Sequence, residues 1–406
     1  MAVPKLRFKE FDGNWSEISF QDLFIFKNGV NASKEQYGSG IKFINVLDII
    51  NNPNGITYDS IIGSVNITSK EIDKNLVKYG DVLFQRSSET REEVGQSNVY
   101  LGKDPVVFGG FVIRGSAQNE YDPIFMNGLL KTDSLRDQIT QLSGGSTRFN
   151  IGQDSLNKVS AYLPLKEEQT KIASFLSAVD EKMSQLTQKH KLLSQYKQGM
   201  MQKLFSQQIR FKADDGSEFG EWEETTLGQT GKFIGGGTPS KENSEFWEGS
   251  IPWISSSDLT EESIFEINIT RFISQNALNQ SATKLVPSNS ILIVSRVGVG
   301  KVAITSHEIC TSQDFTSLAL HKGSSIFFAY LIKSLTPYLL EMNQGTSIKG
   351  FVKDDLANLE LKVPCLEEQT KIANFLSRID QKIEVVAQQI EQAKLWKKGL
   401  LQQMFV

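Results

Sequence analysis

The sequence of 406 residues has little cysteine, little histidine and no long apolar run. Its two cysteines, Cys310 and Cys365, cannot form a disulfide framework, so we expect a chain that folds in a reducing compartment. No apolar stretch approaches the roughly 20 residues of a membrane-spanning helix. The mixed, charged segment 1–10 also lacks the pattern of a secretory signal peptide. Together these absences predict a cytoplasmic protein with no membrane contact.

The chain also lacks the excess of basic residues that is typical of proteins that bind nucleic acid unaided. It carries 43 lysines and arginines against 47 aspartates and glutamates, which gives a net charge of -4 at pH 7. A free-standing nucleic-acid-binding domain more often has a pI above about 9. Any role on DNA would therefore need help from partner proteins.

Catalytic motifs are missing as well. The string nearest to a methyltransferase Asn-Pro-Pro-Phe motif is Asn-Pro-Asn-Gly at 52–55. The segment 298–301 resembles the end of a phosphate-binding loop, but valine follows its lysine where Ser or Thr is needed, and the upstream glycine is absent. The histidines at 190, 307 and 321 do not have the spacing of metal ligands. We therefore expect a chain that is not an enzyme.

The sequence does contain an internal repeat, in which one unit occurs twice. Segments 164–205 and 364–405 align without a gap, and both carry Glu-Glu-Gln-Thr-Lys-Ile-Ala near their start. Apolar or semi-apolar residues recur in both at steps of three and four, close to the heptad pattern of a coiled coil. Each segment opens with a proline and then two glutamates, which the helix dipole favours in a first turn. The pattern predicts two helices of about 40 residues, each on the order of 60 Å long at about 1.5 Å per residue.

Helices of this length need another long apolar surface, and each is the obvious partner of the other. Because a globular segment precedes each helix, antiparallel pairing would place the two globules at opposite ends of a rod. The alternative of two ordinary core helices fits poorly, since helices average about 11 to 12 residues. Gly199 and Gly399 hold the same place in both helices. Because mid-helix glycine costs roughly 1 kcal/mol, we expect a close backbone approach or a kink there.

The repeat extends into the segments that precede the helices. Leu-Arg-Phe-Lys at 6–9, followed by Trp15, matches Ile-Arg-Phe-Lys at 209–212, followed by Trp222. Short β-branched and aromatic runs bounded by Gly, Asn, Ser and Pro, such as 81–84 and 290–294, predict strands in both globules. Helical pieces are expected near 123–142 and 326–340. The loops between the matched flanks share little, as expected of a scaffold that presents two different binding surfaces.

The fold class that follows is α+β with a pseudo-twofold internal repeat. Two domains of mixed α/β type are joined by two long antiparallel helices that form a coiled coil. The predicted boundaries are 1–160 and 208–362 for the two domains, and 164–207 and 364–406 for the two helices.

These features closely resemble the DNA-specificity subunit of type I restriction-modification systems. The resemblance rests on the paired Pro-x-x-Glu-Glu-Gln-Thr-Lys-Ile-Ala-x-Phe-Leu helix openings, on Gly-Thr-Pro-Ser at 237–240 and on Ile-Pro-Trp-Ile-x-x-x-Asp-Leu at 251–259. It covers essentially the whole chain. The first copy departs from the pattern, with Asn-Ala-Ser at 31–33 and with Phe43 where the second copy has Trp253.

The resemblance implies a division of labour. Each globule would be a target-recognition domain that reads one half of an asymmetric bipartite target in double-stranded DNA. The helical rod would fix the gap between the halves and bind two methylation subunits, which transfer a methyl group from S-adenosylmethionine to adenine. Restriction subunits would join them to translocate and cleave DNA with ATP and magnesium. This chain itself would then be non-catalytic and bind no cofactor or metal.

Candidate DNA contacts are predicted from side-chain chemistry. Base readout in the major groove needs Arg, Lys, Asn, Gln, Ser or Thr, while phosphate contacts mostly position the protein. The richest loops are 85–98 in the first globule, its counterpart at 295–301 in the second, and the glycine-containing turns at 145–148 and 345–349. For any one residue the alternative is a solvated loop position. As a group, the DNA-binding candidates are Arg86, Arg91, Arg148, Arg296 and Lys301.

Polar residues at matching places on the two long helices are interpreted as contacts with two identical partners on the rod's outer faces. The alternative is that they only keep the helices soluble. A different class of function, a coiled-coil adaptor that bridges two proteins and never contacts DNA, would also suit the acidic balance, but the divergent loops favour DNA reading. A specificity module for a single-chain restriction-methylation enzyme is a third possibility. The partner-binding candidates are Gln169, Lys171, Lys182, Gln202, Gln369, Lys371, Lys382 and Gln402.

Overall fold

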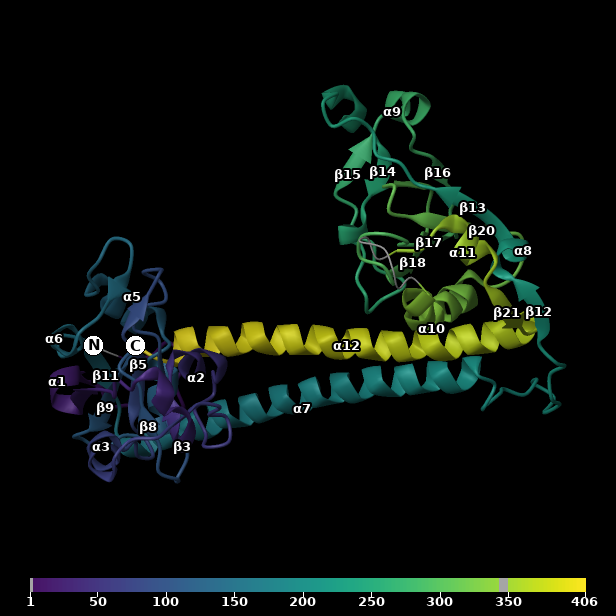
Figure 1. Ribbon diagram of the computed structural model, residues 1–406. Coiled ribbons are helices and arrows are strands. Elements are labelled where there is room, and N and C mark those ends of the chain that lie inside the picture. Colours follow the sequence, from purple (N-terminus) through teal and green to yellow (C-terminus); the bar gives the residue numbers. More distant parts are fainter. Residues whose placement is uncertain (1–2, 343–349) are drawn as a thin grey trace. The chain divides into compact units, whose positions relative to one another are not determined.

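The computed structural model describes residues 3–342 and 350–406 (Figure 1). Its internal contacts divide the chain into two units. Unit 1 is Met1–Gln188 with Gln388–Val406, and unit 2 is Lys189–Ala387. Each unit therefore contains one globule, the beginning of the long helix that follows it, and the end of the other long helix. The turn at 345–349, one of the loops predicted to contact DNA, lies outside the described residues.

The two long helices have the predicted length and direction. Helix α7 spans Lys166–Phe205 and helix α12 spans Leu366–Met404. In unit 1 the start of α7 lies beside the end of α12, where Asp180 pairs with Lys397. In unit 2 the start of α12 lies beside the end of α7, where Asp380 pairs with Lys197. The antiparallel pairing within each unit is therefore the same.

A buried carboxylate ties the start of each long helix to its globule. In unit 1, Glu168 accepts hydrogen bonds from Arg7 Nε and Nη2 at 2.8 and 2.7 Å and from Trp15 Nε1 at 3.4 Å. In unit 2, Glu368 accepts hydrogen bonds from Arg210 Nε and Nη2 at 3.1 and 2.8 Å and from Trp222 Nε1 at 3.1 Å. The repeated Arg and Trp of the sequence are thus the groups that hold the helices.

The globule of unit 1 is built on a four-stranded sheet in the order β2-β9-β5-β7 and a three-stranded sheet in the order β4-β3-β8. A short ladder of β1 with β11 closes the globule just before α7 begins. The strands are β1 (Ser16–Ser19), β2 (Phe24–Asn28), β3 (Tyr37–Ile44), β4 (Ser64–Val65), β5 (Val82–Gln85), β6 (Ser87–Ser88), β7 (Ser97–Val99), β8 (Val107–Phe108), β9 (Val112–Ala117), β10 (Phe149–Asn150) and β11 (Ser160–Leu163). The helices are α1 (Phe20–Leu23), η1 (Lys34–Gln36), α2 (Val46–Asn51), α3 (Ser69–Asn75), α4 (Pro123–Leu129), α5 (Asp133–Gln141) and α6 (Gln153–Leu156).

The globule of unit 2 repeats this plan with a four-stranded sheet in the order β13-β20-β17-β18 and another in the order β15-β14-β19-β16. The ladder of β12 with β21 takes the place of β1 with β11. The strands are β12 (Glu223–Thr226), β13 (Gly231–Gly235), β14 (Ile251–Ile254), β15 (Arg271–Ile273), β16 (Leu285–Val286), β17 (Ile291–Ile293), β18 (Val302–Ile304), β19 (Ile309–Thr311), β20 (Thr316–Leu320) and β21 (Glu360–Val363). The helices are α8 (Leu227–Thr230), η2 (Ser244–Trp247), η3 (Ser256–Asp258), α9 (Gln275–Gln280), α10 (Ser325–Met342) and α11 (Lys353–Ala357).

The observed fold confirms the α+β prediction and the internal repeat. The runs predicted as strands at 81–84 and 290–294 form β5 and β17, which hold the same place in their sheets. The helical piece predicted near 123–142 forms α4 and α5, and the one near 326–340 forms α10. The sequence repeat is thus a repeat of topology.

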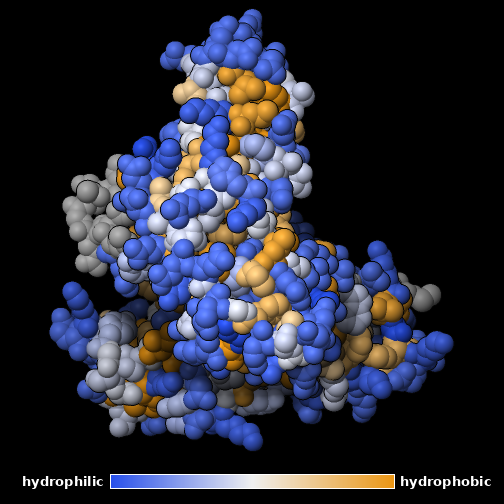
Figure 2. Space-filling view, turned by 90° about the vertical axis from the view of Figure 1, so that its right-hand side faces the viewer, coloured by the Kyte–Doolittle hydropathy of each residue, from blue (hydrophilic) through white to orange (hydrophobic). Residues whose placement is uncertain are grey.

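The core of each globule includes the end of a long helix. In unit 1, Phe405 packs against Phe125 of α4 and against Trp15, with ring centroids 5.1 and 6.4 Å apart. In unit 2, Phe205 at the end of α7 packs against Phe327 of α10 at 5.7 Å. On the face drawn in Figure 2, hydrophilic side chains cover most of the surface and apolar ones reach it in smaller patches.

Gly199 and Gly399 do not mark a close backbone approach, so that half of the expectation is wrong, while a kink there stays a prediction. Helices α7 and α12 continue through both positions. At both glycines, no neighbouring atom outside the helix's own backbone lies within 4 Å of the place where a Cβ would stand. The helices therefore carry two mid-helix glycines that no packing contact requires.

We expect Gly199→Ala and Gly399→Ala to raise the free energy of unfolding by about 0.5 to 1 kcal/mol each, because alanine has the higher helix propensity and meets no neighbour. Urea unfolding of the full chain would measure this. Gly29→Ala is the matched control and should destabilise, since its Cβ would lie 2.3 Å from the backbone oxygen of Gly109. Loss of stability in the two helix variants would contradict the open environment described here.

A lysine lies near each interhelical ion pair. Burial, together with the nearby charge of Lys197, lowers the pKa of Lys333 in α10 to about 8. Burial likewise lowers the pKa of Lys131, just after α4, to about 7, with Lys397 adding to the shift. In both units an aspartate of the ion pair opposes the shift without cancelling it.

These lysines predict how stability depends on pH. On unfolding, Lys333 regains a pKa of about 10.4, so between about pH 8 and 10 the unfolded chain holds a proton that the folded chain has released. The contribution of Lys333 to the free energy of unfolding should therefore rise with pH in this window and be constant, and unfavourable, below it. Lys333→Met should reduce the rise in urea unfolding at about pH 7, 8.5 and 9.5. Lys353→Met, at an exposed position in the same unit, should keep the wild-type slope, and equal slopes in all three proteins would contradict the assignment.

Candidate functional site

Three of the predicted DNA-binding arginines gather around one short ladder in unit 1. Strand β10 pairs antiparallel with β6, with Phe149 opposite Ser88. This pairing brings the turn that carries Arg148 to the loop that carries Arg86. The guanidinium of Arg91 lies 5.3 Å from the centre of the Phe149 ring. All three arginine side chains are exposed, and we call them the arginine cluster. The loop that carries Arg86 and Arg91 also carries the exposed glutamates Glu89, Glu92 and Glu93.

In unit 2, Arg296 and Lys301 lie in the loop between β17 and β18. Arg296 is exposed, while Lys301 is half-buried and donates a hydrogen bond to the backbone oxygen of Ser256 at 3.0 Å. The amide of Phe351 donates to Ser295 O at 2.9 Å, as the amide of Ile151 donates to Arg86 O at 3.0 Å in unit 1. The loop that carries Arg86 and the loop that carries Arg296 therefore begin at equivalent positions in the two globules.

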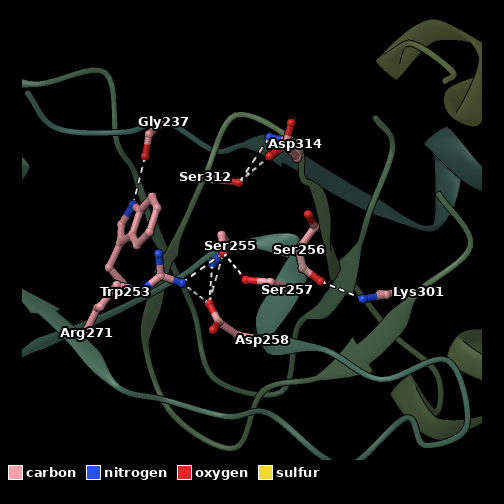
Figure 3. A network of polar contacts seen from close by, with 10 residues as sticks. All are labelled: Gly237, Trp253, Ser255, Ser256, Ser257, Asp258, Arg271, Lys301, Ser312 and Asp314. Atoms are coloured by element: carbon pink, nitrogen blue, oxygen red, sulfur yellow. Dashed lines mark hydrogen bonds and ion pairs between the residues drawn. The ribbon is translucent and has the colours of Figure 1, made fainter. Parts of the chain in front are cut away.

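A polar network surrounds Trp253 in unit 2 (Figure 3). The indole N–H of Trp253, on β14, donates to Gly237 O at 3.0 Å. Arg271 stands opposite Trp253 on β15 and places its guanidinium 4.7 Å from the indole centre. Its Nη2 donates to Ser255 Oγ at 2.8 Å and forms an ion pair with Asp258. The Arg271 side chain keeps 37% exposure, so a fixed guanidinium remains open to solvent.

Further hydroxyl and carboxylate groups adjoin this network. Ser312 Oγ donates to Asp314 Oδ2 at 3.0 Å, and Ser255 and Ser257 share a hydroxyl contact at 2.9 Å. In the sequence, Trp253 and Asp258 stood out as part of a motif, but Arg271 did not. Its only signal would have been the pairing of β14 with β15, which a single sequence does not reveal.

Unit 1 has a pocket of about 470 Å³ beside the arginine cluster. Arg86 connects the two, because its amide donates to Phe111 O at 2.9 Å and its Nη1 lies 3.5 Å from Gly110 O. Leu47 and Phe111 on the pocket wall are 63% and 64% exposed. The lining is mostly apolar and includes Asn31, Tyr37, Phe43, Leu47, Gly110 and Phe111.

Two of the partner-binding candidates do not lie on an outer face, so that part of the expectation is wrong. Gln169 is buried, donates to Pro164 O at 2.9 Å and accepts from the Asp122 amide at 2.9 Å. Gln369 is buried in the same way, with bonds to Pro364 O at 2.9 Å and from the Ser324 amide at 3.0 Å. Both side chains join the first turn of a long helix to its own globule.

The other six candidates remain at least partly exposed. Lys171 pairs with Glu10 at 3.4 Å, and Lys371 pairs with Asp214 at 2.6 Å. Lys182 and Lys382 are exposed at matching places. Gln202 lines a pocket of about 630 Å³ in unit 2, and Gln402 donates to Asp133 at 3.2 Å. Their role in partner binding stays a prediction.

Within residues 3–342 and 350–406, no group of three or more His, Cys, Asp or Glu side chains is placed to hold a metal ion. The same part of the chain contains no helix that is both long and apolar enough to cross a membrane. Cys310 is buried and Cys365 exposed, and neither forms a disulfide.

Comparison with known proteins gives the chain's relatives. A family model described as type I restriction modification DNA specificity domain matches residues 12–194 and 220–395. The putative type I restriction enzyme MjaX specificity subunit of Methanocaldococcus jannaschii is 26% identical over 98% of this chain and 94% of its own length. The type I restriction enzyme HindI specificity subunit of Haemophilus influenzae is 24% identical over 87% of this chain and 90% of its own length.

Solved structures share the fold. The type I restriction-modification S subunit from M. genitalium has a TM-score of 0.57 at 19% identity, over 100% of this chain and 99% of that chain. The HsdS subunit from Thermoanaerobacter tengcongensis has a TM-score of 0.53 at 17% identity, over 96% of both chains.

Proposed function

The chain belongs to the family of type I restriction-modification DNA specificity subunits, whose general role is recognition of a DNA target, and from this premise we propose that its two globules each read one half of a split target. The observation that carries the proposal is the repeat itself. One scaffold occurs twice and presents exposed basic side chains from the corresponding loop, with Arg86 in unit 1 and Arg296 in unit 2. Two readers on one chain suit a target with two different halves.

The basic side chains have the chemistry that a DNA contact needs. Lysine and arginine that neutralise phosphates release counterions from DNA, and this release supplies much of the affinity. The arginine cluster offers three such groups on a chain whose net charge is -4. Glu89, Glu92 and Glu93 lie in the same loop as Arg86 and Arg91, so binding would depend on the arginines themselves and on surfaces that partners supply.

The long helices suit two further roles. At about 1.5 Å per residue, a helix of 40 residues is on the order of 60 Å long, and recognition sites on one face of B-DNA repeat about every 34 to 36 Å. The helices would therefore set the gap between the half-sites. Lys182 and Lys382, exposed at matching positions, suit contacts with two identical methylation subunits. S-adenosylmethionine, ATP and magnesium would be bound by methylation and restriction subunits, and this chain would contribute no catalytic group.

The proposal is tested by co-expressing the chain with the methylation subunit of its own system and mapping methyladenine across a genomic library by single-molecule sequencing. We expect a split motif with one modified adenine on each strand, because each globule would place one methylation subunit on its half-site. Unmodified DNA despite a well-formed complex would contradict DNA reading and favour an adaptor.

The spacer role makes its own prediction. Residues 185–191 of α7 and 386–392 of α12 lie midway between the two interhelical ion pairs along their helices. Deleting both segments removes one heptad from each helix, or about 10 Å, which corresponds to about 3 base pairs at 3.4 Å each. The mapped motif should keep both half-sites and shorten its gap by about that amount. Altered half-sites with an unchanged gap would refute the spacer role.

The arginine cluster is tested by the triple variant Arg86→Gln, Arg91→Gln and Arg148→Gln in the assembled complex. We expect weaker binding to the target and a smaller salt dependence, with a slope reduced by roughly 0.9 for each lost phosphate contact. The control replaces three exposed lysines outside these loops, Lys70, Lys103 and Lys158, by glutamine. An equal loss of affinity and slope in the two variants would show that only total charge matters.

A further inference from the structure

Equivalent backbone hydrogen bonds show that the surface around the unit 1 pocket corresponds to the polar network of unit 2. The amide of Val30 donates to Phe108 O at 2.9 Å, and that of Gly237 donates to Thr311 O at 2.8 Å. Ile44 is the parallel partner of Phe108, as Ile254 is of Thr311. These pairs fix the correspondence of the two sheets residue by residue.

The same correspondence holds at the rim. The amide of Arg86 donates to Phe111 O at 2.9 Å, and that of Ser295 donates to Asp314 O at 2.8 Å. Phe111 and Asp314 are therefore corresponding residues.

A second rim position is fixed by the turns after β3 and β14. The Asn45 amide donates to Asp48 Oδ2 at 2.8 Å, and the Ser255 amide donates to Asp258 Oδ2 at 2.7 Å. Leu47 and Ser257, each one residue before its aspartate, therefore correspond.

The two surfaces share this frame but not their side chains. Unit 1 has Leu47 and Phe111 where unit 2 has Ser257 and Asp314. On the neighbouring strand, the residue opposite Trp253 in unit 2 is Arg271. In unit 1 the amide of Phe43 donates to the oxygen of a glycine, Gly63, at this place. One surface is thus apolar and the other carries hydroxyl, carboxylate and guanidinium groups.

The apolar surface of unit 1 is built as an open pocket. A Cβ on Gly109 would lie 2.7 Å from the Phe43 ring, and one on Gly110 would lie 1.8 Å from Asn31 Oδ1. Glycine at both positions therefore leaves room for the lining side chains. Leu47 and Phe111 remain 63% and 64% exposed beside Arg86, so an apolar contact surface lies next to a group that suits a phosphate. DNA supplies both features, because the major groove carries the 5-methyl group of thymine between two phosphate backbones.

The surface of unit 2 has the opposite chemistry beside its own basic residue. Lys301 donates to Ser256 O at 3.0 Å, at the edge of the network. Carboxylates accept hydrogen bonds from the amino groups of cytosine and adenine, and arginine donates to the acceptors of guanine. Asp314 and the exposed part of Arg271 are groups of these kinds.

We propose that these corresponding surfaces determine the two half-sites, with Leu47 and Phe111 of unit 1 selecting thymine through its methyl group and Ser257, Arg271 and Asp314 of unit 2 selecting bases through hydrogen bonds. The inference rests on the proposed function and assigns the base-reading residues within it. The differing half-sites then follow from differing side chains on one backbone frame.

The test maps the methylated motif of the wild-type complex and of the variant that combines Leu47→Ser with Phe111→Asp, which gives unit 1 the side chains of unit 2. One half-site should change at thymine positions, while the other half-site and the gap stay the same. The converse variant, Ser257→Leu with Asp314→Phe, should change only the other half-site. Tyr79→Asp, at a residue of unit 1 that is 54% exposed outside this surface, is the control and should leave the motif unchanged.

A binding measurement isolates the methyl group. Replacing the selected thymine by deoxyuridine in a target duplex should weaken the wild-type complex about fourfold, as expected for one buried methyl group. Leu47→Ala with Phe111→Ala, which introduces no charge, should bind both duplexes equally. Equal wild-type affinity for thymine and deoxyuridine at every position, or a half-site without thymine, would overturn the assignment. A wild-type split motif that all surface variants retain would overturn it too and leave the proposed function standing, whereas the absence of any wild-type motif would contradict the proposed function itself.

Discussion

The buried glutamate in the first turn of each long helix is the interaction on which the rest of the structure depends. Glu168 and Glu368 are 2% and 0% exposed, and a carboxylate removed from water must be compensated by strong donors. An arginine binds each carboxylate through two hydrogen bonds, and the carboxylate in turn raises the pKa of that arginine. A tryptophan N–H adds a further bond. Such paired charge-assisted bonds fix orientation as well as distance. The direction in which each helix leaves its globule is therefore set, as the proposed spacer role requires.

The same helices complete the cores of the globules that they leave and reach. Phe405 belongs to the aromatic cluster around Trp15, and the Leu6 amide donates to Gln403 O at 2.8 Å. Unit 1 is thus closed by the last residues of the chain, and unit 2 by the end of α7. Neither globule has its full core without a helix that starts in the other half of the sequence, which makes the helix pair part of each fold as well as a connector.

The features of the fold that could be predicted from the sequence are those that depend on local sequence patterns. The lengths and antiparallel pairing of α7 and α12 follow from periodicity and a gapless repeat, which need no knowledge of distant contacts. Gln169 and Gln369 were misjudged because a polar residue in a first helical turn is usually solvated. Both side chains are instead buried against their globules, where they accept hydrogen bonds from the backbone amides of Asp122 and Ser324, far away in the sequence.

Only part of the candidate site could be predicted, because the rest depends on contacts between residues that are far apart in the sequence. Side-chain type alone singled out Arg86, Arg91 and Arg148, but the two-residue strands that gather them carry no recognisable sequence pattern. Arg271 gave no signal, because its place beside Trp253 depends on the pairing of two strands. Comparison of the two copies in space shows which positions can differ. Where a side chain makes the contact, as Glu168 and Glu368 do, both copies keep the residue. Where the backbone makes it, as at the carbonyls of Phe111 and Asp314, the side chain is not needed for the bond and can differ between the two copies. The scaffold is held by backbone hydrogen bonds around the two corresponding surfaces and by side-chain bonds in the first turns of the long helices. The side chains on these surfaces can therefore change without a change of fold.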